Sequence, residues 1–297
     1  MLDVRRLRLL SELSRRGTIA EVARVVGYTP SAISQSLARL EREAGIPLLE
    51  RDGRHVRLTP AAHGLVSRTD RVLAELDAAE AELAAEQETV RGELVIGAFP
   101  SAAGLLVAPA IRELSELYPD LACSIREHEP EDGIQLLRSG ELDILVSESY
   151  DLVDTAPIGG LESHLLLTEP LLLVLPRDDS LPEPVRLDTL KDADWVAGIT
   201  GTQFAAAFDR ACHAAGFAPR IAHRADEAFL FECLVGAGLG IGLLPELACT
   251  DDANLTFARV APPAPSRLVS AFLRRGAARR PAVAEVLEAL RRHVGAL

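Results

Sequence analysis

The stretch that most constrains this chain is residues 18–40, TIAEVARVVGYTPSAISQSLARL, which predicts two short helices separated by a tight turn. Thr18 can cap the first helix through its hydroxyl, and Glu21 three residues later completes a capping box. Gly27 permits the left-handed backbone that ends a helix, and Thr29 then caps a second helix. The pattern predicts a helical hairpin with sharply defined ends.

The second helix of this hairpin has an inner and an outer face. Ile33, Leu37 and Leu40 recur at helical spacing and are expected to be buried. The outer face is small and polar with a basic end, which suits a helix lying in a DNA major groove. An ordinary helical hairpin in a larger domain would carry the same caps, so the flanking segments must decide. The residues expected at the DNA from this segment are Thr29, Pro30, Ser31, Ser34, Gln35 and Arg39.

A basic hairpin follows, in residues 41–60, EREAGIPLLERDGRHVRLTP. The dipeptide Asp52-Gly53 is a strong signal for a hairpin turn, and Arg51 and Arg54 lie on either side of it. Arginine at the tip of such a wing suits a narrow minor groove or the phosphates beside it. The alternative is a solvated basic hairpin, but the preceding helices favour DNA contact. Residues 1–58, here called the head, are therefore predicted to be an all-α winged helix-turn-helix DNA-binding domain.

Charge is divided unevenly along the 297 residues, whose net charge is −13. The head contains eleven Arg and seven Asp or Glu, a net charge of +4, so the remainder carries −17. A basic head on an acidic body fits a DNA-binding domain attached to a part that stays off DNA.

A long helix is predicted next, from Thr59-Pro60 to about residue 88. Its apolar positions form one narrow seam, which a lone helix in water cannot bury. We expect residues 59–90 to be a linker helix that pairs with a second copy of itself, and packing against its own chain is the alternative. The seam residues are Leu65, Val72, Leu76 and Leu83.

From residue 91 onward, short apolar strands alternate with helical segments, which predicts an α/β architecture. We expect residues 91–297 to form two lobes joined by two crossovers. Lobe I would contain residues 91–162 and 266–297, and lobe II residues 163–265. Residues 163–168 and 171–175 are expected to be two separate strands.

Several function classes lack support in the sequence. There is no GKS/T phosphate loop, no H-E-x-x-H and no G-x-S-x-G, and the glycines of residues 236–242, GAGLGIG, lack dinucleotide spacing. We therefore expect no catalytic residues, no enzyme activity, no metal and no cofactor. The four cysteines form no C-x-x-C pair and are expected to be reduced, with a redox switch as the alternative. No apolar run suggests a membrane span or signal peptide, so a cytoplasmic protein is expected.

The chain resembles the LysR-type transcriptional regulators. The resemblance is carried by YTPSAISQSLARLEREAGIPLLER and RHVRLTP in the head, and more loosely by RGELVIGAFPSAAGLL, GELDILV and LVGAGLGIGLLPEL. It implies a winged helix-turn-helix, a linker-helix dimer and a two-lobed sensor of the type II periplasmic-binding-protein fold. It also implies a homotetramer, a dimer of dimers on double-stranded DNA, controlled by a small-molecule effector between the lobes. A metabolic enzyme and a non-specific nucleoid-type binder remain alternatives, disfavoured by the missing catalytic motifs and the acidic body.

The same resemblance implies where an effector would bind. It places Ser101, beside Ala102, at the first polar effector contact, with Thr200 and Thr202 on the loop that faces it. Helix N-termini favour anions, so a carboxylate would suit these positions. The chain departs from the family in its acidic loop EHEPED, residues 127–132, which includes Glu129, and in Glu148 on the next strand-end loop. If these carboxylates face the site, an amino acid or a related amine would suit both the hydroxyl positions and the acidic positions. The alternative is that the carboxylates form a solvated acidic rim, which would leave the effector undefined.

Overall fold

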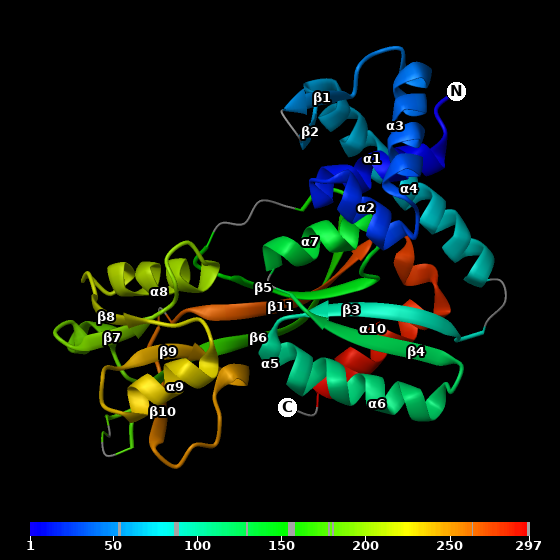
Figure 1. Cartoon of the computed structure of the whole chain (residues 1–297). Helices are drawn as coiled ribbons and strands as arrows, with labels where there is room; N and C mark the ends of the chain where they lie inside the picture. The colour runs from blue at the N-terminus through cyan, green and yellow to red at the C-terminus, as the bar shows by residue number, and fades with distance from the viewer. Residues whose placement is uncertain are drawn as a thin grey trace.

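The computed structural model describes residues 1–52, 55–85, 89–128, 130–153, 158–177, 179, 181–262 and 264–295. A helical head and a long helix lie against a sensor built from two α/β lobes (Figure 1). Among the helices of the described ranges, none is both long enough and apolar enough to cross a bilayer.

The head begins with three helices whose ends fall where the sequence predicts them. The Thr18 hydroxyl accepts from the Glu21 N–H at 3.3 Å, and the Thr29 hydroxyl accepts from the Ala32 N–H at 3.2 Å. Gly27 has φ 72°, the left-handed conformation expected of a helix end. The capping box does not close, because the Glu21 carboxylate binds Arg24 instead. The helices are α1 (Val4–Arg16), α2 (Ile19–Val26) and α3 (Pro30–Ala44).

The wing is the antiparallel pair β1 (Leu49–Asp52) and β2 (His55–Leu58). Glu41 of α3 fixes its base, because one carboxylate oxygen accepts from the Leu48 N–H at 2.9 Å and the Leu49 N–H at 3.0 Å. Gly53, Arg54 and the side chain of Arg51 lie outside the described residues.

The long helix α4 (Pro60–Ala85) packs against α1 and is capped by the Thr59 hydroxyl, which accepts from the Ala62 N–H at 3.2 Å. Its proposed seam residues differ in surroundings. Leu65 packs against the apolar core of the head, whereas Val72 and Leu76 are 46% and 45% exposed. The Leu83 side chain lies outside the described residues.

A seven-stranded sheet connects the two lobes, in the order β10-β6-β11-β5-β3-β4 with β9 also paired to β6. Lobe II adds the parallel pair β7 and β8. The strands are β3 (Gly92–Ala98), β4 (Leu121–Glu127), β5 (Ile144–Tyr150), β6 (Leu161–Pro176), β7 (Asp194–Ala197), β8 (Arg220–Arg224), β9 (Gly242–Pro245), β10 (Leu255–Arg259) and β11 (Ser266–Arg274).

Helices cover these strands and enclose a separate core in each lobe. In lobe I, α6 and α10 cover one face of the sheet and α7 covers the other (Figure 1). In lobe II, α8 and α9 pack on a core centred on Trp195, Phe208 and Phe231. The helical segments are α5 (Pro100–Ala102), η1 (Ala103–Val107), α6 (Ala108–Leu117), α7 (Pro130–Ser139), η2 (Leu187–Leu190), α8 (Gln203–Ala214), α9 (Ala228–Gly236), η3 (Glu246–Ala248), η4 (Ala277–Arg279) and α10 (Pro281–Val294).

Strand β6 departs from the sequence prediction of two strands, since it is continuous over 16 residues. Its first part pairs with β11 in lobe I and its last part pairs with β9 and β10 in lobe II. Pro170 lies where the partners change, so its missing N–H does not interrupt the strand. The two lobes therefore share β6 as one connection, and the chain crosses back to lobe I between β10 and β11.

We predict that Val72→Glu combined with Leu76→Glu separates the pair of α4 helices. Uncompensated charge buried in an apolar seam costs about 3–5 kcal/mol, so the dimer dissociation constant should rise at least about a hundredfold. Sedimentation velocity over a concentration series measures this shift. Ser67→Glu adds charge at an exposed position on the other side of α4 and should leave the oligomer unchanged. An unchanged oligomer in the double variant would show that this face is not the seam.

Candidate functional site

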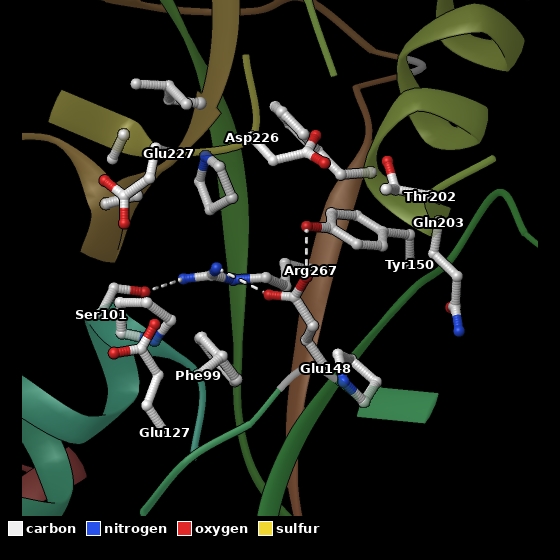
Figure 2. A pocket seen from close by; sticks show the side chains of 17 residues that line it. Phe99, Ser101, Glu127, Glu148, Tyr150, Thr202, Gln203, Asp226, Glu227 and Arg267 are labelled. Atoms are coloured by element: carbon white, nitrogen blue, oxygen red, sulfur yellow. Dashed lines mark hydrogen bonds and ion pairs between the residues drawn. The ribbon is translucent and has the colours of Figure 1, made fainter. Parts of the chain in front are cut away.

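A cavity of about 260 Å³ lies between the two lobes, close to the lower end of the range for small-molecule pockets. Lobe I contributes the ends of β4 and β5 and the start of α5. Lobe II contributes the starts of α8 and α9 (Figure 2). The polar side chains that line the cavity are those of Ser101, Glu127, Glu148, Tyr150, Thr202, Gln203, Asp226, Glu227 and Arg267.

Arg267 forms the base of this interlobe cavity and is only 3% exposed. Its Nε donates to Glu169 Oε1 at 2.7 Å, and its Nη1 donates to Glu148 Oε2 at 2.9 Å. Its Nη2 donates to the Ser101 hydroxyl at 3.2 Å (Figure 2). The guanidinium also lies over the Phe99 ring, 4.8 Å from the centroid, where the ring face attracts a cation. Two carboxylates therefore balance one buried cation.

Glu169 extends this network into lobe II. Its carboxylate is 5% exposed, and Oε2 accepts from the Leu247 N–H at 2.6 Å. Ser101 of α5 and Leu247 of η3 are thus connected through Arg267 and Glu169, and the Leu247 side chain also packs against the core of lobe I. The relative position of the lobes depends on a polar network as well as on β6.

Glu148 and Tyr150 form the wall beside Arg267. Burial raises the pKa of Glu148, and the charge of Arg267 only partly offsets this effect. The Tyr150 hydroxyl donates to Glu148 Oε1 at 3.1 Å. Burial, with the neighbouring Glu148 charge, raises the pKa of Tyr150 well above its usual value, so this hydroxyl remains a donor at neutral pH. For Arg267, burial opposes the charge but Glu148 and Glu169 outweigh it and raise its pKa.

Three exposed carboxylates, here called the rim carboxylates, surround the cavity opening: Glu127 from lobe I, and Asp226 and Glu227 from lobe II. Asp226 Oδ1 accepts from the Ile199 N–H at 2.7 Å and so holds the loop before α8. Within the described ranges, no cation forms an ion pair with a rim carboxylate. Negative charge therefore faces the opening from both lobes.

The effector positions expected from the sequence fall in different places. Ser101, Thr202 and Glu148 line the cavity, whereas Ala102 is buried in the core of lobe I and Thr200 is exposed outside the cavity lining. The Thr202 hydroxyl is already engaged as the cap of α8, where it accepts from the Ala205 N–H at 3.2 Å and donates to the Ile199 carbonyl at 2.9 Å. Glu129 lies outside the described residues.

Arg267 and Glu169 are not among the site residues expected from the sequence, although the sequence around each of them carries a recognisable signal. In β11, buried positions alternate with partly exposed ones, and Arg267 lies at a buried position, as do Val269, Ala271 and Leu273. Glu169 interrupts the otherwise apolar run LLLTEPLLLVLP of β6. A charged side chain at a strand position that faces the core requires a buried partner. Asp226 and Glu227 carried no comparable signal, because they lie in a polar loop.

The head presents a second candidate surface. Ser31, Ser34, Gln35 and Arg39 of α3 are exposed, as are Thr29 and Pro30 at its start. Ile33, Leu37 and Leu40 are buried beneath them. The α3 surface is therefore free to contact a DNA groove. Across the described ranges, no group of three His, Cys, Asp or Glu side chains could hold a metal ion.

Comparison with known proteins gives two family matches. The family described as "LysR substrate binding domain" matches residues 87–295. The family described as "Bacterial regulatory helix-turn-helix protein, lysR family" matches residues 4–63. Together they cover almost the whole chain.

Individual relatives and solved structures agree with these matches. A probable hydrogen peroxide-inducible genes activator of Streptomyces viridosporus is 30% identical over 295 residues, covering 96% of this chain and 92% of the relative. The transcriptional dual regulator GltC of Bacillus subtilis is 27% identical, covering 82% of this chain and 81% of GltC. Full-length OxyR from Pseudomonas aeruginosa, solved as a point variant, has a similar fold, with a TM-score of 0.76 at 21% identity, covering 98% and 95% of the two chains. CbnR bound to its target DNA has a TM-score of 0.56 at 22% identity, covering 99% and 100%.

We predict that Arg267→Met lowers the free energy of unfolding of the sensor by about 3–5 kcal/mol, because Glu148 and Glu169 lose their buried counter-ion. Burial already raises the pKa of Glu148, and loss of the Arg267 charge would raise it further. The destabilisation is therefore largest at neutral pH and declines as the pH falls below this raised pKa toward the ordinary value for glutamate. Chemical denaturation at neutral and mildly acidic pH measures the difference from the unmodified protein.

The matched control is Arg259→Met, which removes an exposed arginine 3.8 Å from Glu246. Its effect should stay within about 0.5 kcal/mol at either pH. A destabilisation by Arg267→Met that is equal at both pH values would indicate lost packing rather than unbalanced charge.

Proposed function

Since the chain belongs to the LysR family of transcriptional regulators, we propose that its effector is a small molecule bearing an ammonium or guanidinium group, such as an amino acid or a related amine. The chain itself is a DNA-binding transcriptional regulator with an effector-binding sensor, and its family consists of regulators rather than enzymes. The proposal concerns which molecule the sensor detects and which residues bind it.

The distribution of charge around the interlobe cavity carries the proposal. Arg267 is already matched by Glu148 and Glu169, so it has little charge left to attract an anion. The rim carboxylates have no such partner among the described residues. A cationic group at the opening would relieve repulsion among them and form charge-assisted hydrogen bonds.

A carboxylate on the same effector has a place as well. Thr202, Gln203 and Phe204 bring the N-terminus of α8 to the cavity wall, and a helix N-terminus favours negative charge. An amino acid would place its carboxylate there and its ammonium group near the rim carboxylates. A simple amine would use only the acidic part.

Such a cation would favour closure of the lobes. Glu127 belongs to lobe I and Asp226 and Glu227 to lobe II, so a cation between them binds best when the lobes approach. Preferential binding to the closed form shifts the population toward it. We propose that this shift alters the spacing of DNA-binding heads within the oligomer.

DNA recognition would divide between two sets of residues. Ser31, Ser34 and Gln35 would contact base edges in the major groove, while Arg39 and the wing arginines Arg51 and Arg54 would contact phosphates. Regulators of this family bind DNA and form oligomers. We propose a dimer of dimers, paired through α4 with Val72 and Leu76 in the seam, that acts in the cytoplasm on the cell's DNA.

A thiol-based peroxide response is the alternative, prompted by the printed name of the Streptomyces relative. Such a response requires a reactive thiolate. Burial raises the pKa of Cys212 and of Cys249 to about 12, and it also raises the pKa of Cys123. These three thiols are therefore poorly suited to peroxide chemistry, and the exposed Cys233 is the thiol that such a response would have to use.

We predict that amino acids or amines raise the melting temperature of the protein, while plain aliphatic and aromatic acids leave it unchanged, because only bound ligands stabilise by mass action. Glu127→Gln should weaken binding of the best amine about tenfold, since it removes a charged hydrogen-bond partner. Glu116→Gln, on the exposed surface of α6, is the matched control. Thermal shift and calorimetry provide these measurements.

The same binding should depend on pH. Protonation of Glu148 removes a negative charge from the cavity, and its pKa is raised by burial. As the pH is lowered, the affinity for the amine should therefore begin to fall at a pH above the ordinary pKa of glutamate. Glu148→Gln should make this dependence on pH smaller. Stabilisation by plain acids alone would overturn the proposed effector class, as would operator binding that responds to hydrogen peroxide and to no ligand.

A further prediction concerns the head. Gln35→Ala should lower the ratio of operator affinity to random-DNA affinity by about 5- to 150-fold, which corresponds to the ~1–3 kcal/mol of a good bidentate base contact. Arg39→Ala should instead weaken both affinities similarly and reduce their salt dependence. Fluorescence anisotropy at matched salt concentrations measures both. An unaltered ratio for Gln35→Ala would exclude base reading by that side chain.

A further inference from the structure

We propose that α7 couples the interlobe cavity to the head within one chain, through an ion pair between Arg16 of α1 and Glu141, which lies just after α7. Neither residue belongs to the DNA surface or to the cavity lining. The proposal concerns how occupancy of the cavity reaches α3, and it holds for any effector class.

Helix α7 begins at the cavity and lies directly on the sheet. Pro130, its first residue, lines the cavity. Gly133 allows close approach, because a Cβ there would lie 2.5 Å from a methyl carbon of Leu145 in β5. Leu137 is fully buried against Leu145 and Leu142 on this face. A displacement at the cavity end is therefore transmitted along a closely packed helix rather than absorbed in a loop.

Glu141 is fixed to the far end of α7. Its backbone N–H donates to the Leu136 carbonyl at 3.0 Å, and its Oε1 accepts from the Ser139 hydroxyl at 3.2 Å. The other carboxylate oxygen, Oε2, lies 2.7 Å from Nη2 of Arg16. The side chains of Arg16 and Glu141 are both mostly buried by this contact.

Arg16 is held equally firmly on the side of the head. Its Nε donates to Glu12 Oε2 at 2.7 Å, and Glu12 Oε1 also accepts from Arg15 at 2.6 Å. Arg16 thus bridges a carboxylate of the head and a carboxylate of the sensor. Hydrogen bonds of this kind weaken steeply with distance and angle, so a small movement of Glu141 alters the contact.

The surrounding contacts carry such a movement to α3. Helix α1 packs against both α3 and α4, and α4 packs against α7 and η4. Figure 1 shows the head directly above α7, with α1 and α2 between α7 and α3. A change in the Arg16–Glu141 contact would therefore change how the head is held on the sensor.

Coupling between two sites is reciprocal, so DNA can replace the unidentified effector as the probe. We suggest hydrogen exchange of the full-length chain with and without a duplex carrying its operator, defined by footprinting. In the unmodified protein, operator binding should slow exchange in α3 and also change exchange in residues 130–141. In Glu141→Gln, the change in residues 130–141 should be lost while the protection of α3 remains.

Two further variants sharpen the test. Arg16→Gln breaks the same pair from the side of the head and should cause the same loss, so the test does not rest on one variant. The double variant should lose no more than either single variant, as expected for two residues acting through one contact. Glu116→Gln, in an exposed pair on α6, should behave like the unmodified protein.

Either of two results would overturn the proposal. One is a response of residues 130–141 that persists in both Glu141→Gln and Arg16→Gln. The other is an unmodified protein in which operator binding protects α3 but leaves residues 130–141 unaffected. Exchange of β5 and α10 without DNA should match in all variants, which separates lost coupling from lost folding.

Discussion

Arg267 is held between Glu148 and Glu169 at a depth where any one of these charges alone would cost several kcal/mol. The three charges are supplied by β5, β6 and β11, and β11 lies between the other two in the sheet although Arg267 is 98 and 119 positions away from Glu169 and Glu148. Correct pairing of these strands is therefore a condition for burying the charges. The polar links from this network to Ser101 and Leu247 then place one lobe relative to the other.

This balance determines what the rest of the cavity can recognise. Because the guanidinium is satisfied internally, the electrostatic character of the opening comes from carboxylates that have no cationic partner among the described residues. A buried cation thus coexists with an acidic opening, and the proposed cationic effector depends on that opening.

The sequence predicts the head closely because its signals are local. Thr29 caps a helix that starts one residue later, and Ile33, Leu37 and Leu40 share a face within three turns. The cavity depends on contacts that a linear sequence does not display. Ser101 and Arg267 are 166 positions apart, and only the sheet order brings them together. Ala102 and Thr200 illustrate the converse, since positions taken from a resemblance fall outside the cavity lining.

Strand β6 was predicted as two strands because Glu169-Pro170 interrupts the apolar run, yet the backbone passes through both lobes without a break. Because β6 is hydrogen-bonded to neighbouring strands on both sides of Pro170, it connects the lobes as a stiff ribbon rather than as a flexible loop. Its available motion is twisting about its own length, helped by the register shift of β11 between Val269 and Ser270. Lobe closure in this molecule would then be a small rotation about the axis of β6, opposed by an elastic restoring force from the twisted strand.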